Sequence, residues 1–442
     1  MKDILEVIII GVVVYLVSDL YKRRVFSLFL CMITYALFSD YIFFMAGYEV
    51  GELSIGKMFV EIMFVFVFLI ALIDFFKYLR VREHRGINKN VFIFTSFVLF
   101  LSLILVFFGS IDNGIVNAVN GWRAIFLPIL LVELLLYICP DSMSSESFWR
   151  RISLVVVTLS LVNAIYAILQ YISYTGHLED AWRYDLLLEA RELRGVNEGL
   201  NAHFLQYQIE RNSNLRASGF MVSALSFGYF TSLAFVFSIW KLITSSKLLV
   251  RLIWLLISVF LFAGIYTSQV RTALIIPLLS FIIFYWINIY RPHQKTILWV
   301  TLFSPLFIAL GSILLADGLD TSSMGRIIQY SNLLSDFKIF GYGLGSYLGK
   351  FDSYYIHILM TIGLFAFIPL SYFVYKLKNL ISVSNANAND RSLMIALSLS
   401  IVLFSVFFVQ HIASSLYYFL SILLISGIVK RDTEKNSFEV GL

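Results

Sequence analysis

Arginine side chains at the ends of apolar stretches are the groups in this sequence best placed to bind an anion. Arg216 comes directly before one such stretch, and Arg271 stands in the short segment between two others. A guanidinium group donates several hydrogen bonds in a fixed plane, a geometry that suits phosphate and diphosphate. A salt bridge to a carboxylate of the same loop is the alternative for each arginine. Three further arginines are reserve candidates for the same role: Arg123, Arg194 and Arg326.

Two side chains are candidates for a base that accepts a proton from a hydroxyl group. Asp352 stands beside Ser353 where an apolar stretch begins, and His411 lies in the very short turn between the last two stretches. Carboxylate and imidazole groups both serve as general bases. Aspartate is also a favoured helix N-cap, and His411 equally fits a hydrogen bond to a neighbouring helix. The sequence leaves these alternatives open.

Glu133 stands in the middle of an apolar stretch, and Asn163 and Gln170 are milder cases of polar residues in such positions. An ionisable group at this depth is costly and normally faces the protein interior or a cavity. Glu133 could relay protons in a transporter, pair with an arginine, or be protonated.

Three glycines around Tyr342, at positions 341, 343 and 345, form a short Gly-rich segment. The segment follows a predicted helix and not a strand, which argues against a phosphate loop for a nucleotide. Glycine here is better suited to let the backbone approach another backbone, or a ligand, closely. The six histidines and two cysteines show no metal-ligand spacing, so we expect neither a metal nor another cofactor.

The stretches that must position these groups are long enough to cross a membrane. The 442 residues are 60% hydrophobic and only 14% charged, which excludes an ordinary soluble domain. Continuous apolar runs of this length favour helices over the strands of a barrel. We therefore predict an all-α polytopic membrane helix bundle with about 12–13 transmembrane helices. The expected spans are residues 4–20, 25–46, 58–76, 91–109, 124–139, 152–174, 218–240, 252–269, 272–290, 296–315, 354–375, 392–410 and 413–429.

Basic residues gather in every second loop between these spans. This alternation is the positive-inside pattern, which predicts that the basic loops and the C-terminus face the cytoplasm and the N-terminus faces outward. The net charge of +5 is then a signal of topology and gives no reason to expect a nucleic-acid partner. The basic groups are Lys22–Arg24, Lys77–Lys89, Arg150–Arg151, Lys241–Arg251, Arg291–Lys295, Lys376–Arg391 and Lys430–Lys435.

Two long loops, residues 174–217 and 316–353, fall on the outer side and are expected to form a cap on a single transmembrane domain, residues 1–442. Leucines between Leu186 and Leu200 suggest an amphipathic helix in the first loop. Ser322 or Ser323 can cap a short helix in the second loop.

Taken in order, four segments resemble the bacterial O-antigen polymerase (Wzy-type) family, within the superfamily that also contains O-antigen ligases. They are Arg216–Phe220, Thr267–Ala273, Gly341–Ser346 and the helix start at Asp352–Ser353. Tyr342 and Asp352 stand where ligases tend to place histidine, which favours the polymerase. Gln269-Val270 replaces the serine that most often precedes the family arginine, and the Met221–Ser223 segment lacks the expected Asn or Pro.

The resemblance implies a metal- and nucleotide-independent glycosyltransferase of the bacterial inner membrane. Its substrates are oligosaccharide repeat units on undecaprenyl diphosphate, and it moves the growing glycan from its lipid diphosphate to a sugar hydroxyl of the incoming unit on the periplasmic face. Arg216 and Arg271 would bind the diphosphate, while Asp352 or His411 would accept the hydroxyl proton. Membrane lipid, a chain-length regulator and the flippase of the same pathway are the other partners considered.

Two other functions compete with this interpretation. A ligase would use the same donor and pass the glycan to a lipid A core. A flippase for the lipid-linked unit would suit Glu133, but the sequence shows neither an internal repeat nor paired Gly/Pro-broken helices, and the outer loops would be unexplained.

Overall fold

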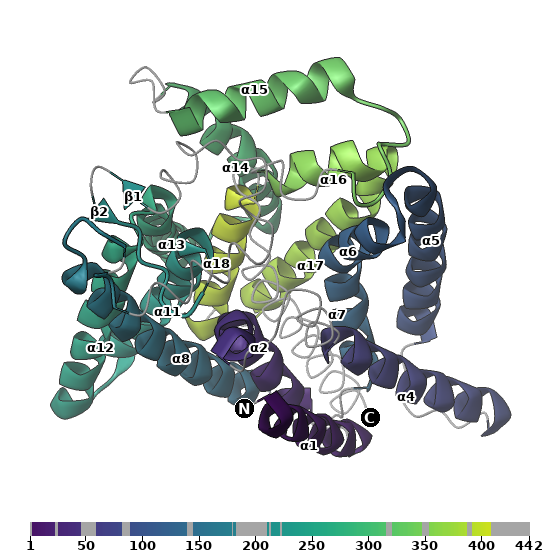
Figure 1. The fold of residues 1–442 in the computed structure, drawn as a ribbon, viewed down its shortest axis with the longest axis horizontal. Coiled ribbons are helices and arrows are strands. Elements are labelled where there is room, and N and C mark those ends of the chain that lie inside the picture. Colours follow the sequence, from purple (N-terminus) through teal and green to yellow (C-terminus); the bar gives the residue numbers. More distant parts are fainter. Residues whose placement is uncertain are drawn as a thin grey trace. The chain divides into compact units, whose positions relative to one another are not determined.

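The computed structural model describes most of the predicted spans and part of the loops between them (Figure 1). The chain forms two compact units. The first unit comprises Met1–Phe66 with Glu146–Phe281, and the second comprises Val67–Ser145 with Ile282–Leu442. The described residues are 2–22, 25–45, 59–81, 89–138, 145–178, 180–182, 210–211, 214–221, 223–314, 321–346, 353–386 and 391–407.

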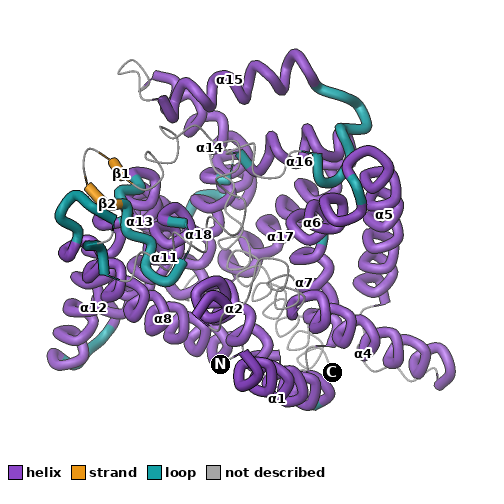
Figure 2. Tube along the Cα trace, in the orientation of Figure 1, coloured by secondary structure: helices purple, strands orange, loops and turns teal. Residues whose placement is uncertain are grey.

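Helices occupy the predicted spans up to residue 406, except that the span 218–240 becomes helical only at Ala224. The last predicted span, 413–429, lies outside the described residues. Within the described part of the chain, seven helices are long and apolar enough to cross a membrane, or eight if the bent pair α6–α7 counts as one span. The only described strands are an antiparallel pair of two residues each, β1 (Glu210–Arg211) and β2 (Asn214–Leu215), shown in orange in Figure 2. The chain is a multi-pass membrane protein of all-α architecture, as predicted.

Close contacts between helices in the first unit depend on small residues. Its helices are α1 (Lys2–Tyr21), α2 (Val25–Met45), α8 (Ser145–Ser173), α11 (Ala224–Thr244), α12 (Leu248–Thr267) and the start of α13 (Arg271–Tyr290). Ser238 of α11 and Ser258 of α12 share a buried hydrogen bond of 2.9 Å. A Cβ atom at Gly264 of α12 would lie 2.7 Å from the Cβ of Ala164 on α8. Small residues and interhelical hydroxyl bonds are the usual means of packing helices in lipid.

The first unit has one basic end. Arg150 lies near the start of α8, Lys241 in the last turn of α11, and Lys247 is the N-cap of α12. The opposite ends of α8 and α12 carry Gln170 and Thr267. The three helices therefore place their cations together, as the alternation of basic loops predicts.

The second unit is built around a broken span. Its helices are α5 (Lys89–Asn113), α6 (Ile115–Ile125), α7 (Leu127–Ile138), α14 (Gln294–Leu314), α15 (Thr321–Asp336), α16 (Tyr354–Ile362), the 3-10 turn η2 (Gly363–Ala366), α17 (Phe367–Ala386) and α18 (Arg391–Val406), with most of α4 (Phe59–Val81). Helices α6 and α7 meet at an angle of 50°. The helix expected in the second outer loop is present as α15, although it starts at Thr321.

Two sequence predictions for this unit are wrong in detail. The predicted span 124–139 is not one continuous helix that begins after Arg123, because Arg123 lies in the last turn of α6 and the chain breaks at Phe126 before α7 begins. Pro128 stands in the first turn of α7, where a missing N–H is tolerated. Lys376 does not belong to a basic loop but lies inside α17, where its side chain is buried.

Candidate functional site

The segment that contains Arg216 is fixed by hydrogen bonds to α8 and α12. The Ala217 N–H donates to the Thr267 carbonyl over 3.0 Å, where α12 ends. The Gly219 N–H donates to Oε1 of Gln170 over 3.0 Å, and the amide of Gln170 donates back to the Gly219 carbonyl over 3.3 Å. Because buried backbone groups need partners, these bonds allow a non-helical segment to lie within the bundle.

Asn163 supplies the remaining contact and explains the glycine of this segment. Its Oδ1 accepts a hydrogen bond of 2.7 Å from the Phe220 N–H. Gly219 has φ = 61°, and a Cβ there would lie 2.8 Å from both Cγ and the backbone oxygen of Asn163. Only glycine fits this conformation and this space. Asn163 and Gln170, which the sequence identified only as polar residues within a span, therefore position the Arg216 segment.

The Arg216 side chain is 6% exposed and Ser218 is 1% exposed. A guanidinium group taken out of water is stable only where negative charge or several acceptors face it. The segment therefore presents a cation at a buried position of the helix bundle, next to the end of α12.

Arg271 is the first residue of α13, and the turn Ser268–Val270 separates it from α12. Ser268 is fully buried, and its hydroxyl donates to the Ile265 carbonyl over 2.6 Å and accepts from the Val270 N–H over 3.3 Å. Gln269 adopts a left-handed conformation with φ = 55°. These bonds fix the direction in which α13 starts.

Helix α11 approaches this turn closely. A Cβ at Gly228 would lie 2.8 Å from Oγ of Ser268, and Ser232 donates a 2.5 Å hydrogen bond to the Ala273 carbonyl. Tyr229 and Thr272 are also hydrogen-bonded through their hydroxyl groups. The small and polar residues of the turn are thus explained by packing, whereas the exposed Arg271 is not.

The position of Arg271 has an electrostatic cost. A helix N-terminus carries partial positive charge, so a cation in the first turn is unfavourable by about 0.3–1 kcal/mol at an exposed site. An anion bound there would be attracted by both the side chain and the positive end of the helix dipole. Since Ala217 is bonded to Thr267, the Arg216 segment and the Arg271 turn are neighbours at the same end of the first unit.

An aromatic cluster follows Arg216 and was not expected from the sequence. The ring centroid of Phe220 lies 4.1 Å from that of Tyr166 and 4.9 Å from that of Tyr41. The ring centroids of Trp182 and Tyr166 are 4.8 Å apart. The Trp182 side chain is 45% exposed. These residues come from distant parts of the chain, so no local sequence pattern could reveal the cluster.

Tyr174, just beyond the end of α8, links the loop to the helix by donating its hydroxyl to Oε1 of Glu210 in β1. Desolvation by burial, together with the hydrogen bond and charge of Glu210, raises the pKa of Tyr174 to about 12. The neutral tyrosine is thus the form that the fold favours, and it holds the hairpin that leads into the Arg216 segment.

The Gly-rich segment lies in the second unit and packs backbone against backbone. Gly341, Gly343 and Gly345 all have positive φ, at 73°, 83° and 89°. A Cβ at Gly341 would lie 2.6 Å from the Gly363 nitrogen, and one at Gly345 would lie 2.8 Å from the Ala118 nitrogen. The space that a phosphate would need at these two glycines is filled by neighbouring main chain.

Neighbouring helices hold this segment in place. Asn113, at the end of α5, donates to the carbonyls of Tyr342 over 3.1 Å and Leu344 over 3.3 Å. The Tyr342 N–H donates to the Met360 carbonyl over 2.9 Å, and Lys338 lies 3.9 Å above the Tyr342 ring. The glycines therefore anchor the chain after α15 to α5, α6 and α16.

The remaining candidate residues are distributed as follows. Arg123 is half-buried and donates to Asn120 of its own helix over 3.3 Å. Arg326 belongs to α15, but its side chain lies outside the described part, as do Arg194, Asp352 and His411. Ser353 is the N-cap of α16 and accepts a 3.3 Å hydrogen bond from the Ile356 N–H, so the capping position beside Asp352 is already filled.

Glu133 forms a buried ion pair with a lysine and not with an arginine. Its Oε1 lies 2.5 Å from Nζ of Lys376 and accepts a 2.9 Å hydrogen bond from the Tyr372 hydroxyl. The side chains of both charged residues are at most 7% exposed. The ion pair joins α7 to α17 and explains why each of these apolar helices contains a buried charged residue.

Among the described residues, no group of three or more His, Cys, Asp or Glu side chains could hold a metal ion. Comparisons with protein-family models, with curated proteins and with solved structures each found no match to this chain.

Proposed function

We propose that this chain is an O-antigen polymerase that joins oligosaccharide repeat units carried on undecaprenyl diphosphate at the periplasmic face of the bacterial inner membrane. The observation that supports this most is the hydrogen bond between Ala217 and Thr267. It makes the Arg216 segment and the Arg271 turn neighbours, at the end of the bundle opposite to the basic loops. Two guanidinium groups at the outer end of membrane helices suit a lipid diphosphate.

The chemistry requires charge stabilisation on the leaving group. A hydroxyl oxygen of the incoming unit attacks the anomeric carbon of the growing glycan, the bond from that carbon to the diphosphate oxygen breaks, and undecaprenyl diphosphate leaves. Arg216 and Arg271 would offset the negative charge that develops on the diphosphate. Arg123, Arg194 and Arg326 remain reserve candidates for this role.

A base must take the proton of the attacking hydroxyl. Asp352 and His411 are the candidates, because the sequence predicts that both stand where apolar spans meet the outer side. The presence of Ser353 at the N-cap of α16 supports a role for Asp352 other than helix capping.

The alternatives use the same substrate. An O-antigen ligase would need the same diphosphate site, and only the acceptor differs. For a flippase, Glu133 was the main argument from the sequence, and its pairing with Lys376 gives that residue a structural reason to be present.

Arg271→Ala tests the diphosphate role in the reconstituted polymerisation reaction. Removal of one preorganised group that stabilises a developing charge typically lowers the rate by about 10²–10³-fold, so we expect a loss of that size. Arg291→Ala is the matched control, because Arg291 is exposed and lies just beyond the other end of α13. Equal activity of the two variants would remove Arg271 from the proposed site.

A further inference from the structure

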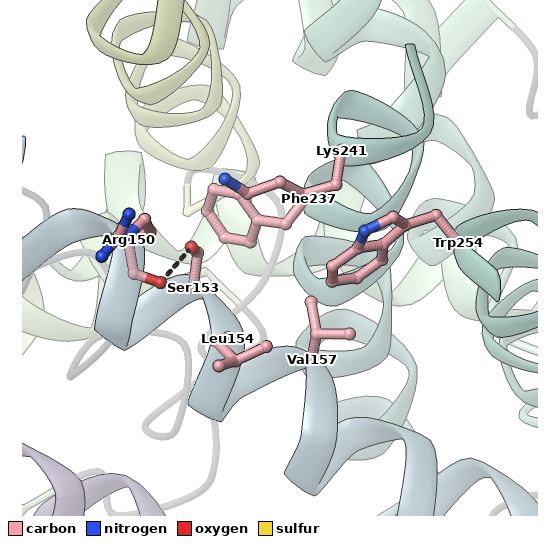
Figure 3. Close-up of a pocket in the computed structure, with 7 residues that line it drawn as sticks. All are labelled: Arg150, Ser153, Leu154, Val157, Phe237, Lys241 and Trp254. Carbon is pink, nitrogen blue, oxygen red and sulfur yellow. Dashed lines mark hydrogen bonds between the residues drawn. The ribbon is translucent and has the colours of Figure 1, made fainter. Parts of the chain in front are cut away.

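A cavity of about 420 Å³ opens at the basic end of the first unit, away from the Arg216 segment. Helices α8, α11 and α12 each contribute to its wall (Figure 3). Two cations, Arg150 of α8 and Lys241 of α11, line it together with apolar residues. In Figure 3 the Lys241 side chain extends over Phe237 toward the side of the cavity where Arg150 lies.

The apolar part of the cavity has a buried floor and an exposed edge. Phe237 and Val157 are each 2% exposed, whereas Leu154 is 56% exposed. The indole of Trp254 forms the wall on α12. A tryptophan near the basic end of membrane helices is typical of the level where lipid headgroups meet acyl chains.

We propose that this cavity binds one anionic phospholipid, with the headgroup phosphate between Arg150 and Lys241 and the start of an acyl chain against Phe237, Val157 and Leu154. Basic pockets between membrane helices bind anionic headgroups in this way. The charge of the cavity matches the phosphate, and its apolar floor matches the chain. A free phosphate would use the cations only and would leave the exposed apolar edge at Leu154 uncovered.

The other cations at this end of the unit lie outside the cavity. Nε of Arg251 donates a 2.5 Å hydrogen bond to the Ser245 carbonyl, closing the turn between α11 and α12. Arg151 lies 5.8 Å from the Phe26 ring of α2. Neither residue lines the cavity, so Arg150 and Lys241 are the cations that the site would use.

This site is separate from the proposed diphosphate site and does not depend on it. Helix α11 has 21 residues and is about 30 Å long at 1.5 Å per residue, close to the thickness of the hydrocarbon core. The cavity lies at the C-terminal end of α11, whereas the Arg216 segment precedes its N-terminus. A lipid in the cavity would therefore belong to the opposite leaflet from a lipid diphosphate at Arg216.

The test is native mass spectrometry of the purified full-length chain titrated in detergent with phosphatidylglycerol or phosphatidylcholine of identical acyl chains. We expect one phosphatidylglycerol molecule to bind per chain, with higher affinity than phosphatidylcholine shows in the matched titration. Each cation that binds the phosphate contributes roughly a fivefold change in affinity, so Arg150→Gln with Lys241→Gln should weaken binding about 25-fold. Arg151→Gln, which removes the same charge one residue away, should change affinity less than twofold.

Several outcomes would overturn the proposal. They are an unchanged affinity of the double variant, an equal loss in Arg151→Gln, equal binding of both lipids, or full competition by inorganic phosphate alone. Leu154→Gln alters an exposed residue of the apolar edge, so folding should be retained. It should weaken phosphatidylglycerol binding, and an unchanged affinity would exclude the acyl-chain contact. Melting temperatures of all variants would show whether the comparison is between folded proteins.

Discussion

Gly219→Ala should destabilise the protein more than most single methyl additions, because two costs combine at this position. A left-handed conformation is unfavourable by about 1–2 kcal/mol for a residue with a Cβ atom. The new Cβ would also lie 2.8 Å from Cγ of Asn163 and displace the carboxamide that accepts the Phe220 N–H. Leaving that amide unsatisfied costs about 1–3 kcal/mol. The expected loss in the free energy of unfolding is therefore about 2–5 kcal/mol.

A double-mutant cycle separates the two costs. Asn163→Ala removes the same hydrogen bond to Phe220, so the double variant should lose less stability than the sum of the single variants by about 1–3 kcal/mol. Unfolding in detergent monitored by circular dichroism gives the three values. Gly176→Ala is the control, since Gly176 also has positive φ but a Cβ there would meet no atom within 4 Å. Strict additivity, or an equal loss at Gly176, would refute the proposed contact.

Three further predictions concern ionisable groups. Because the folded-state pKa of Tyr174 is raised to about 12, its hydroxyl should stabilise the fold fully below pH 10 and lose that effect between pH 10 and 12. The melting temperatures of wild type and Tyr174→Phe should therefore converge over this range. A constant difference between the two melting temperatures would contradict the assignment. Glu133→Gln should lower the free energy of unfolding by about 3–5 kcal/mol, because it leaves the charge of Lys376 unpaired. Adding Lys376→Gln should restore part of that stability in the same unfolding assay, and no restoration would argue against the ion pair. At least one of Asp352→Ala and His411→Ala should abolish polymerisation, and full activity of both variants would exclude both as the base.

The helices followed from the sequence because lipid allows few alternatives. A stretch without charges that is long enough to span must satisfy its backbone internally, and the runs from Ile4 to Val406 become helices for that reason. The exceptions are informative. The break at Phe126 and the 3-10 turn at Gly363 occur within apolar sequence, where hydropathy gives no sign of a bend.

The contacts of the candidate site could not be predicted from local pattern. Gln170 is 49 residues from Gly219, and Asn163 is 57 residues from Phe220. The sequence pattern placed Lys376 in a basic loop, because a single sequence does not show that a lysine pairs with a distant carboxylate. Its partner Glu133 comes 243 residues earlier. The sequence did identify Arg216 and Arg271 as unusual, since both are basic residues on the side where the positive-inside bias predicts few. It also identified the glycines at 341, 343 and 345, which helix propensity does not explain.

Reconstitution tests the proposed function most directly. The purified chain in liposomes would receive undecaprenyl-diphosphate-linked repeat units from its own host, without nucleotide, metal or lipid A core. We expect a ladder of longer lipid-linked glycans that is lost in Arg271→Ala and retained in Arg291→Ala. No ladder, but transfer once lipid A core is added, would contradict the polymerase and indicate a ligase. Movement of the lipid-linked sugar across the bilayer without any product would indicate a flippase.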